Sequence, residues 1–140
     1  MGKLTNRIYD DFNLEQLGYD FMGYYFNNKK ELSYHHIQPR HYGGETTYGN
    51  GSLLNRETSH NYIHIIETTD FKIFLEISQE LRREHKDGIT KEHLQNIKEM
   101  LEFFEEKYKY EYTKRGVPII KDDFIRRRVN YDWCSRLQRV

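Results

Sequence analysis

Five of the seven histidines in this chain fall between residues 34 and 64. Two of them are adjacent, His35 and His36, and two stand four residues apart, His60 and His64. Residues i and i+4 lie on one face of a helix, and imidazole is the usual nitrogen ligand of zinc and its transition-metal neighbours. The segment therefore predicts a fold that brings one face of a helix against the preceding His-His pair.

The residues around these histidines predict two strands and a helix. Residues 31–37 are rich in β-compatible side chains and predict a strand, and residues 52–55 predict a short second strand. Between them, residues 38–51 contain one proline and four glycines, which is typical of an extended loop. Residues 59–67 predict a helix, with Thr58 or the next residue as its cap. A hairpin followed by a packed helix can bring the strand end and the helix face together.

Two further helices are predicted after this segment. Asp70 can cap a helix that runs to about Lys86 and stops at Gly88, and Thr90 can cap the next one. Two amphipathic helices joined by a short turn predict an antiparallel hairpin, packed in the core or against a coiled-coil partner. In the second helix the apolar residues step by three and four, and they form one stripe: Leu94, Ile97, Leu101, Phe104 and Tyr108.

Length and composition favour a single domain with a small, aromatic-rich core. A chain of 140 residues is near the usual domain size. The mean hydropathy is strongly negative, but 15% of the residues are aromatic, and each ring buries a large area. Residues 1–30 predict a helical or irregular segment, in which the apolar stretch 14–26 is interrupted by two glycines. We expect one α+β domain.

Cysteine content and hydropathy exclude several classes of protein. The single cysteine, Cys134, can form neither an intramolecular disulfide nor a thiolate zinc site. No apolar run approaches the ~18 residues of a membrane span, so no membrane association is expected. The N-terminus lacks the apolar core of a signal peptide. We therefore expect a cytoplasmic protein, and no pattern in the chain predicts an oligomeric state.

Charge is balanced overall but unevenly spread. The chain has 22 basic and 22 acidic side chains, which argues against nonspecific nucleic-acid binding through many phosphate contacts. The segment 111–140 nonetheless carries a net charge of +4, and Phe124, Tyr131 and Trp133 indicate that its last twenty residues pack back on the body. It includes three consecutive arginines that can contact nucleic acid or simply face solvent: Arg126, Arg127 and Arg128.

The order of these features resembles that of the HNH endonucleases, which carry a ββα-metal motif. The resemblance rests on the His-His pair, an "IxP" step, a Gly-Gly loop, an asparagine, "LL" and a helix with His-x-x-x-His, and it covers about residues 33–67. It is similar to the version seen in bacterial toxin DNases, and the short chain is similar to small HNH proteins of phages and prophages. It implies a ββα-metal core embedded in helices and a metal-dependent DNA endonuclease, phage- or prophage-encoded in a bacterial host.

The resemblance also implies a role for each motif residue. His36 would be the general base, and Asn50 would orient that base or hold the loop. His35, His60 and His64 would ligate one divalent ion, such as Mg²⁺, Mn²⁺, Ni²⁺ or Zn²⁺. Many members of the family begin the motif with Asp-His, so a histidine at position 35 favours a softer metal than Mg²⁺.

Other residues near the motif have two interpretations each. Arg40 can meet a phosphate oxygen or anchor its loop. Asn55 competes with Asn50 as the motif asparagine, although it stands only five residues before His60. Glu67 can support a ligand histidine or face solvent. Several tyrosines can stack on bases or pack in the core: Tyr24, Tyr25, Tyr34, Tyr42 and Tyr48.

Two other functions stay open beside a DNA endonuclease. A noncatalytic nucleic-acid-binding or phage assembly protein would keep the motif as a metal-held scaffold, and it would bind metal without cleaving. A nuclease directed at RNA would share the site and differ in substrate. The other histidines, among them His41 and His93, are expected to be structural or solvated.

Overall fold

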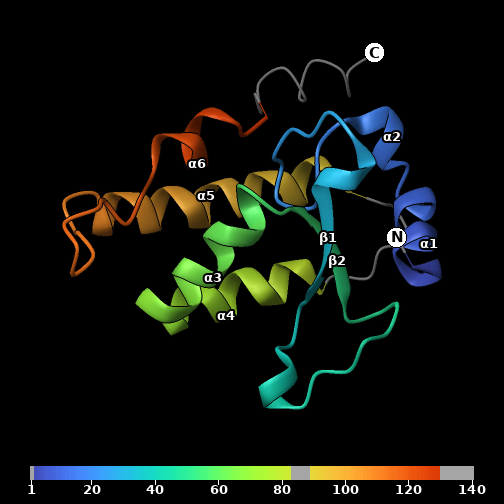
Figure 1. Ribbon diagram of the computed structural model, residues 1–140, viewed down its shortest axis with the longest axis horizontal. Coiled ribbons are helices and arrows are strands. Elements are labelled where there is room, and N and C mark those ends of the chain that lie inside the picture. The colour runs from blue at the N-terminus through green and yellow to red at the C-terminus, as the bar shows by residue number, and fades with distance from the viewer. Residues whose placement is uncertain (1, 83–88, 130–140) are drawn as a thin grey trace.

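The computed structural model describes residues 2–82 and 89–129, and these form a small α+β unit (Figure 1). No helix among the described residues combines the length and the apolarity that a membrane crossing requires. In chain order the elements are α1 (Lys3–Asp11), α2 (Leu14–Leu17), η1 (Lys29–Glu31), β1 (Leu32–His36), η2 (Arg40–Tyr42), β2 (Gly51–Asn55), α3 (Ser59–Thr69), α4 (Phe71–Leu81), α5 (Lys91–Tyr108) and α6 (Asp122–Arg126).

The two predicted strands form an antiparallel hairpin. Leu32 lies opposite Asn55, and His36 lies opposite Gly51 at the other end. A Cβ atom on Gly51 would lie 2.3 Å from the ring of Tyr34, so the absence of a side chain lets that ring close over β2. The connecting loop extends away from α5 and carries the short turn η2 (Figure 1).

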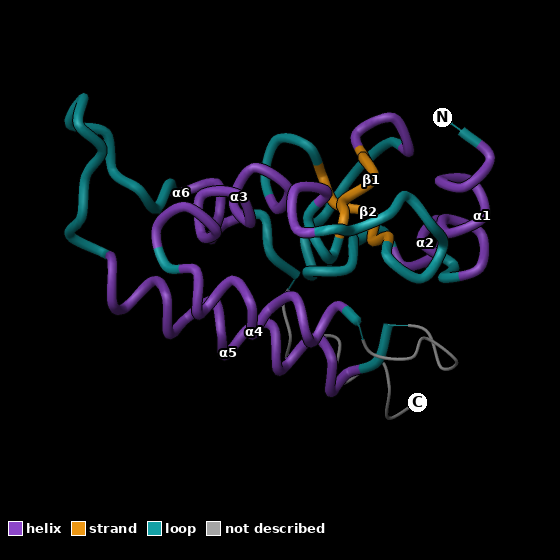
Figure 2. Tube along the Cα trace, turned by 90° about the horizontal axis from the view of Figure 1, so that it is seen from below, coloured by secondary structure: helices purple, strands orange, loops and turns teal. Residues whose placement is uncertain are grey.

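The predicted helical hairpin is confirmed as internal packing. α4 contacts α3 on one side and α5 on the other, and α4 and α5 run side by side in opposite directions (Figures 1 and 2). Asp70 caps α4 by accepting from the Ile73 amide, and Thr90 caps α5 by accepting from the His93 amide. The stripe on α5 faces the core, because four of its residues are buried: Leu94, Ile97, Leu101 and Phe104.

Some predicted helix boundaries are wrong. The helix predicted to reach Lys86 ends at Leu81, because the next seven residues contain no apolar side chain that could extend its buried face. The predicted stop at Gly88 lies outside the described residues. α3 continues past residue 67 to Thr69, and Thr58 occupies its N-cap position without a side-chain cap bond.

A buried carboxylate fixes the hairpin and α3 relative to the N-terminal segment. Asp20 accepts hydrogen bonds from the amides of Met22 (2.9 Å), Tyr24 (3.0 Å) and Asn55 (2.8 Å), and from the Ser59 hydroxyl. Burial outweighs these four bonds and raises the pKa of Asp20 to about 6. One side chain therefore links the irregular segment after α2 to the end of β2 and to the first turn of α3.

Within the described residues the C-terminal segment packs back on the body at Phe124, as predicted, and Tyr131 and Trp133 lie outside the described residues. The ring of Phe124 is buried and stacks on Tyr62, with centroids 4.5 Å apart. Arg128 is held in an ion pair with Glu105 at 3.0 Å, and the two side chains are only 10% and 13% exposed. Of the two interpretations of the arginine triplet, the one in which it simply faces solvent is wrong for Arg128, because its side chain pairs with a nearly buried carboxylate.

Candidate metal centre

β1 and α3 bring three histidines together. His35 lies on β1, and His60 and His64 lie one turn apart on α3. The ring centroid of His35 is 5.2 Å from that of His60 and 5.6 Å from that of His64, and the two α3 rings are 4.9 Å apart. One nitrogen of each ring lies within 4.8 Å of the other two, so the three side chains can hold one metal ion. Three protein ligands leave further coordination positions open, as catalytic metal sites do.

Hydrogen bonds orient the two rings on α3. The Nδ1 atom of His60 is hydrogen-bonded to the Ser33 hydroxyl, which comes from the same strand as His35. The Nδ1 atom of His64 lies 3.2 Å from a carboxylate oxygen of Glu67. Because each Nδ1 has a protein partner, the Nε2 atoms of these two rings are left for a ligand.

His35 has the opposite property, a nitrogen without a partner. Its side chain is buried, and its Nε2 atom has no hydrogen-bond partner among the described residues. Leaving a buried polar atom unsatisfied costs about 1–3 kcal/mol. An ion among the three rings would satisfy this nitrogen, so the donor set fits a divalent metal of the kind that prefers imidazole.

His36 lies on the other face of β1, as the alternation of a strand requires. Its ring packs edge-on against Tyr34, with centroids 4.8 Å apart, and its Nε2 atom is 2.8 Å from the Thr46 hydroxyl. Both His35 and His36 nevertheless line one cavity of about 190 Å³, together with Arg40. β1 ends at His36, so the turn that follows can close a space that both rings reach.

Glu67 forms another wall of this cavity. Its side chain is only 14% exposed, and besides His64 it faces His41, whose Nε2 atom is 3.8 Å from the second carboxylate oxygen. Glu67 therefore supports a candidate ligand, and the alternative that it simply faces solvent is wrong. His41 itself is exposed, whereas His93 is buried and its Nε2 atom is 2.7 Å from the Phe21 carbonyl oxygen.

Three of the histidines at this site, His35, His36 and His60, favour the uncharged imidazole. Burial holds the pKa of His35 well below its usual value, and the neighbouring His60 and His64 add to this effect. Burial, followed by the nearby His64, lowers the pKa of His60 to about 4. The pKa of His36 is also lowered, by burial and then by the charge of Arg40. Neutral rings are the form that binds metal or accepts a proton, so the site is prepared for both at neutral pH.

Replacing Glu67 with Gln is expected to weaken metal binding about 10- to 100-fold, because the carboxylate that orients His64 is lost. Calorimetric titration of metal into the apo protein measures this change. Glu76→Gln, on the exposed face of α4, is the matched control and should bind metal like the wild type. Equal affinity of the Glu67→Gln protein would remove Glu67 from the site.

The metal-free protein is expected to lose stability as the pH falls. The folded pKa of His60, about 4, lies below the unfolded value near 6.5, so its contribution is present above pH 6.5 and disappears as the pH falls through 4. Asp20 acts in the opposite direction because its folded pKa is raised. Comparison of the wild type with a His60→Gln variant separates the contribution of His60 to the pH dependence from that of Asp20. With chelator present, the unfolding free energy of the wild type should fall by about 2 kcal/mol more than that of His60→Gln between pH 7 and pH 4, after allowance for solvent screening. A constant difference would contradict this.

Asn50 holds the loop. Its Oδ1 atom accepts from the Gln38 amide at 2.8 Å, and its Nδ2 atom donates to the carbonyls of Gln38 (3.1 Å) and Glu45 (2.8 Å). Gly44 lets two parts of the loop backbone lie close together, since a Cβ atom at this position would lie 1.8 Å from the Gln38 carbonyl oxygen. Asn55 is instead buried in the Asp20 network, with its Nδ2 atom donating to the Tyr25 carbonyl. Of the two asparagines, Asn50 is the one that holds the loop after β1.

The tyrosines divide between core and surface. Tyr24 is fully buried and donates to the Phe124 carbonyl, and Tyr34 donates to the Thr47 carbonyl at 2.7 Å. Tyr48 donates to a carboxylate oxygen of Asp11 at 2.9 Å. Exposed rings remain at Tyr25 and Tyr42, which are 42% and 55% exposed.

Three residues that orient the site were missed by sequence reasoning. Ser33 had a usable signal, because it lies two residues before His35 and therefore on the same face of a strand. Asp20 is an acid inside an apolar aromatic stretch, which is a signal for a buried hydrogen-bonded carboxylate. Thr46 had none, since its contact with His36 depends on the path of an irregular loop.

No family model, no curated protein and no solved structure matches this chain. The function proposed below therefore rests on the histidine cluster and its surroundings.

Proposed function

We propose that this protein is a metal-dependent DNA endonuclease built on an HNH-type ββα-metal centre. One observation carries the proposal. The buried Nε2 atom of His35, which has no partner in the part of the chain that the structure describes, belongs to a ring that clusters with His60 and His64, and a fourth imidazole, His36, lines the same cavity. Three imidazoles suit a divalent ion, and the fourth suits the activation of water beside it.

The proposed reaction is hydrolysis of a phosphodiester. His35, His60 and His64 would hold a divalent ion, which would supply positive charge to stabilise the phosphate as its negative charge grows. The Nε2 atom of His36 is occupied by Thr46, which leaves Nδ1 to take a proton from water. The new bond joins the water oxygen to phosphorus, and the bond from phosphorus to the 3′ oxygen breaks. That oxygen takes the electron pair and then a proton from solvent, giving a 5′-phosphate and a 3′-hydroxyl.

Arg40 is proposed to attract the phosphate. It is exposed and lines the cavity with His36, and its charge helps to keep the imidazole of His36 neutral by lowering its pKa. A guanidinium can donate two parallel hydrogen bonds to phosphate oxygens. Arg40 therefore supplies a positive charge next to the base.

The principal test is digestion of plasmid, single-stranded DNA and RNA in parallel, with Mg²⁺, Mn²⁺, Ni²⁺ or Zn²⁺ added. The proposal expects cleavage of DNA that requires one of these ions and stops with chelator. Metal binding without cleavage of any substrate would favour the noncatalytic scaffold, and cleavage restricted to RNA would favour the RNA nuclease. Either result would overturn the DNA endonuclease.

The arginines near the C-terminus are expected to separate into two kinds. Arg126 is exposed and Arg127 is partly exposed, so replacing both with Ala should weaken DNA binding and reduce the dependence of log affinity on log salt by about 1–2. Arg128→Ala should instead destabilise the fold by about 3 kcal/mol, because the nearly buried Glu105 would lose its opposite charge and keep only its hydrogen bond from the Tyr62 hydroxyl. Salt titrations of DNA affinity and urea unfolding measure the two effects. An unchanged slope would mean that neither Arg126 nor Arg127 contacts a phosphate.

A further inference from the structure

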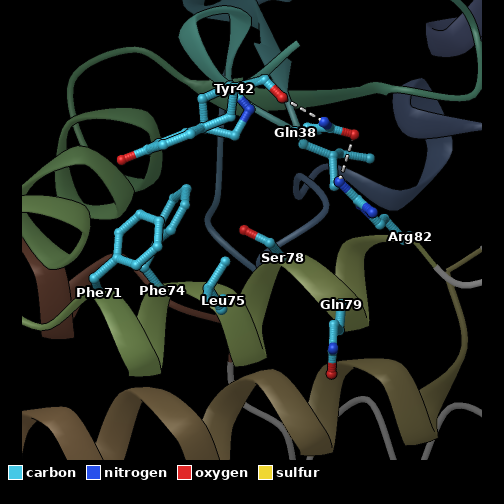
Figure 3. Close-up of a pocket in the computed structure, with 10 residues that line it drawn as sticks. Gln38, Tyr42, Phe71, Phe74, Leu75, Ser78, Gln79 and Arg82 are labelled. Atoms are coloured by element: carbon cyan, nitrogen blue, oxygen red, sulfur yellow. Dashed lines mark hydrogen bonds between the residues drawn. The ribbon is translucent and has the colours of Figure 1, made fainter. Parts of the chain in front are cut away.

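A second cavity lies next to the histidine cavity, on the other side of the turn η2. It has a volume of about 380 Å³ and is bounded by the turn on one side and by α4 on the other (Figure 3). This volume is at the lower end for sites that bind small molecules. Pro39 lines both cavities, so they are immediate neighbours.

The walls of this second cavity are apolar and unusually exposed. Tyr42, Phe71 and Leu75 are 55%, 39% and 47% exposed, although each is large and apolar or aromatic. The rings of Tyr42 and Phe71 pack against each other at one end of the cavity, with centroids 5.6 Å apart and ring planes tilted by 51° (Figure 3). Aromatic faces left open beside a cavity favour a flat ligand that can stack on them.

The cavity also contains polar groups. Ser78 is only 5% exposed, its hydroxyl oxygen has no hydrogen-bond partner among the described residues, and it points into the cavity (Figure 3). A buried hydroxyl of this kind is stabilised by a ligand atom that can pair with it. At one end, Arg82 donates to the side chain of Gln38 at 3.1 Å, and Gln38 in turn donates to the Tyr42 carbonyl at 2.6 Å. This chain of bonds ties the turn to α4 and places a positive charge at the cavity.

We propose that this cavity binds one unpaired nucleobase of the substrate, next to the phosphate held at the histidine centre. The inference rests on the proposed nuclease function and specifies its substrate as single-stranded or locally unpaired nucleic acid. Tyr42 and Phe71 stack on the base, the Ser78 hydroxyl pairs with one of its polar edge atoms, and the charges of Arg82 and Arg40 flank the strand. A base that is still paired in a duplex cannot enter a cavity of this kind, because it must leave its stack first.

The test measures binding without catalysis. The full chain is titrated in chelator against a fluorescently labelled ten-nucleotide single-stranded DNA, and against the same strand with abasic central nucleotides. The wild type should bind the intact strand about tenfold more tightly than the abasic one, since stacking of one base contributes about 1–3 kcal/mol. Tyr42→Ala should lose about tenfold in affinity for the intact strand and nothing for the abasic strand. Tyr110→Ala, 77% exposed just after α5, is the matched control and should behave like the wild type.

Two results would overturn the nucleobase site. One is equal affinity of the wild type for both strands, and the other is an equal loss, or no loss, for both strands in Tyr42→Ala. Failure of the nuclease proposal is recognised separately, in the cleavage assay with metals. If the protein cleaves DNA but binds the intact and abasic strands equally, the nuclease function stands and the nucleobase site is wrong. If Tyr42 is needed to bind the intact strand more tightly than the abasic one but no substrate is cleaved, the nucleobase site stands and the nuclease function is wrong.

Discussion

Replacing His36 with Ala is expected to abolish DNA cleavage while leaving metal bound. A positioned general base contributes about 10²- to 10⁴-fold to a rate, so the variant should cleave plasmid more slowly by that factor. Metal affinity should stay within a few-fold of the wild type, because the metal cluster consists of His35, His60 and His64 and does not include His36. Plasmid cleavage rates and calorimetric titration of the same preparations provide the two measurements.

His41→Ala is the control for this variant. His41 also lines the cavity, but its ring is exposed and faces Glu67 across 3.8 Å, so its loss should change the cleavage rate only a few-fold. If His36→Ala loses metal as severely as it loses activity, His36 is a ligand and its role as base is wrong. If it retains full activity, another group activates the water.

Replacing His60 with Ala is expected to remove metal binding, and with it both cleavage and metal-dependent stabilisation. Ion present at 100 times its dissociation constant should stabilise the wild type by about 2.7 kcal/mol. The variant loses one of three ligands, a larger change than the 10- to 100-fold loss typical of a supporting residue, so the same ion should give it almost no stabilisation. Thermal unfolding of both proteins with and without metal measures the effect.

His36→Ala serves as the control for that experiment, because it should keep the full stabilisation by metal and lose only the reaction. The Ser33 hydroxyl loses its contact with Nδ1 of His60 in His60→Ala, so the comparison is made between metal-loaded and metal-free forms of the same variant. A metal-induced rise in stability equal to that of the wild type would exclude His60 from the site.

Much of the fold around the site could be predicted from the sequence, because local signals there agree with one another. β-compatible residues on both sides of a loop rich in glycine predicted the two strands, and the three-four stripe on α5 predicted its buried face. The i, i+4 spacing predicted that His60 and His64 share a helix face, and these rings lie 4.9 Å apart. These patterns have short range, so they can be read without knowledge of the tertiary structure.

Contacts between segments distant in sequence could not be predicted in this way. Asp20 is bonded to Ser59, 39 residues away, and Arg128 pairs with Glu105. Such pairs depend on how the whole core packs, and a charged residue is usually a surface residue in the absence of that information. Likewise, Thr46 reaches His36 only because Asn50 and Gln38 close the loop between them.

The end of α4 is another feature that local sequence patterns did not predict. Residues after Leu81 have reasonable intrinsic preference for a helix, and the sequence placed the end at a glycine farther along. The helix stops earlier because its apolar face stops at Leu81, and packing contributes more to helix stability than propensity does. The same early end leaves Arg82 at the cavity beside η2.

The most direct measurement is the location of a bound ion. Crystals of the protein grown with Mn²⁺, Ni²⁺ or Zn²⁺, measured at the absorption edge of the metal, should show one anomalous peak bounded by nitrogens of His35, His60 and His64, with His36 beside it and not bonded to it. An ion found elsewhere in the chain, or the absence of any ion between β1 and α3 at saturating metal, would contradict the metal centre and the nuclease function derived from it.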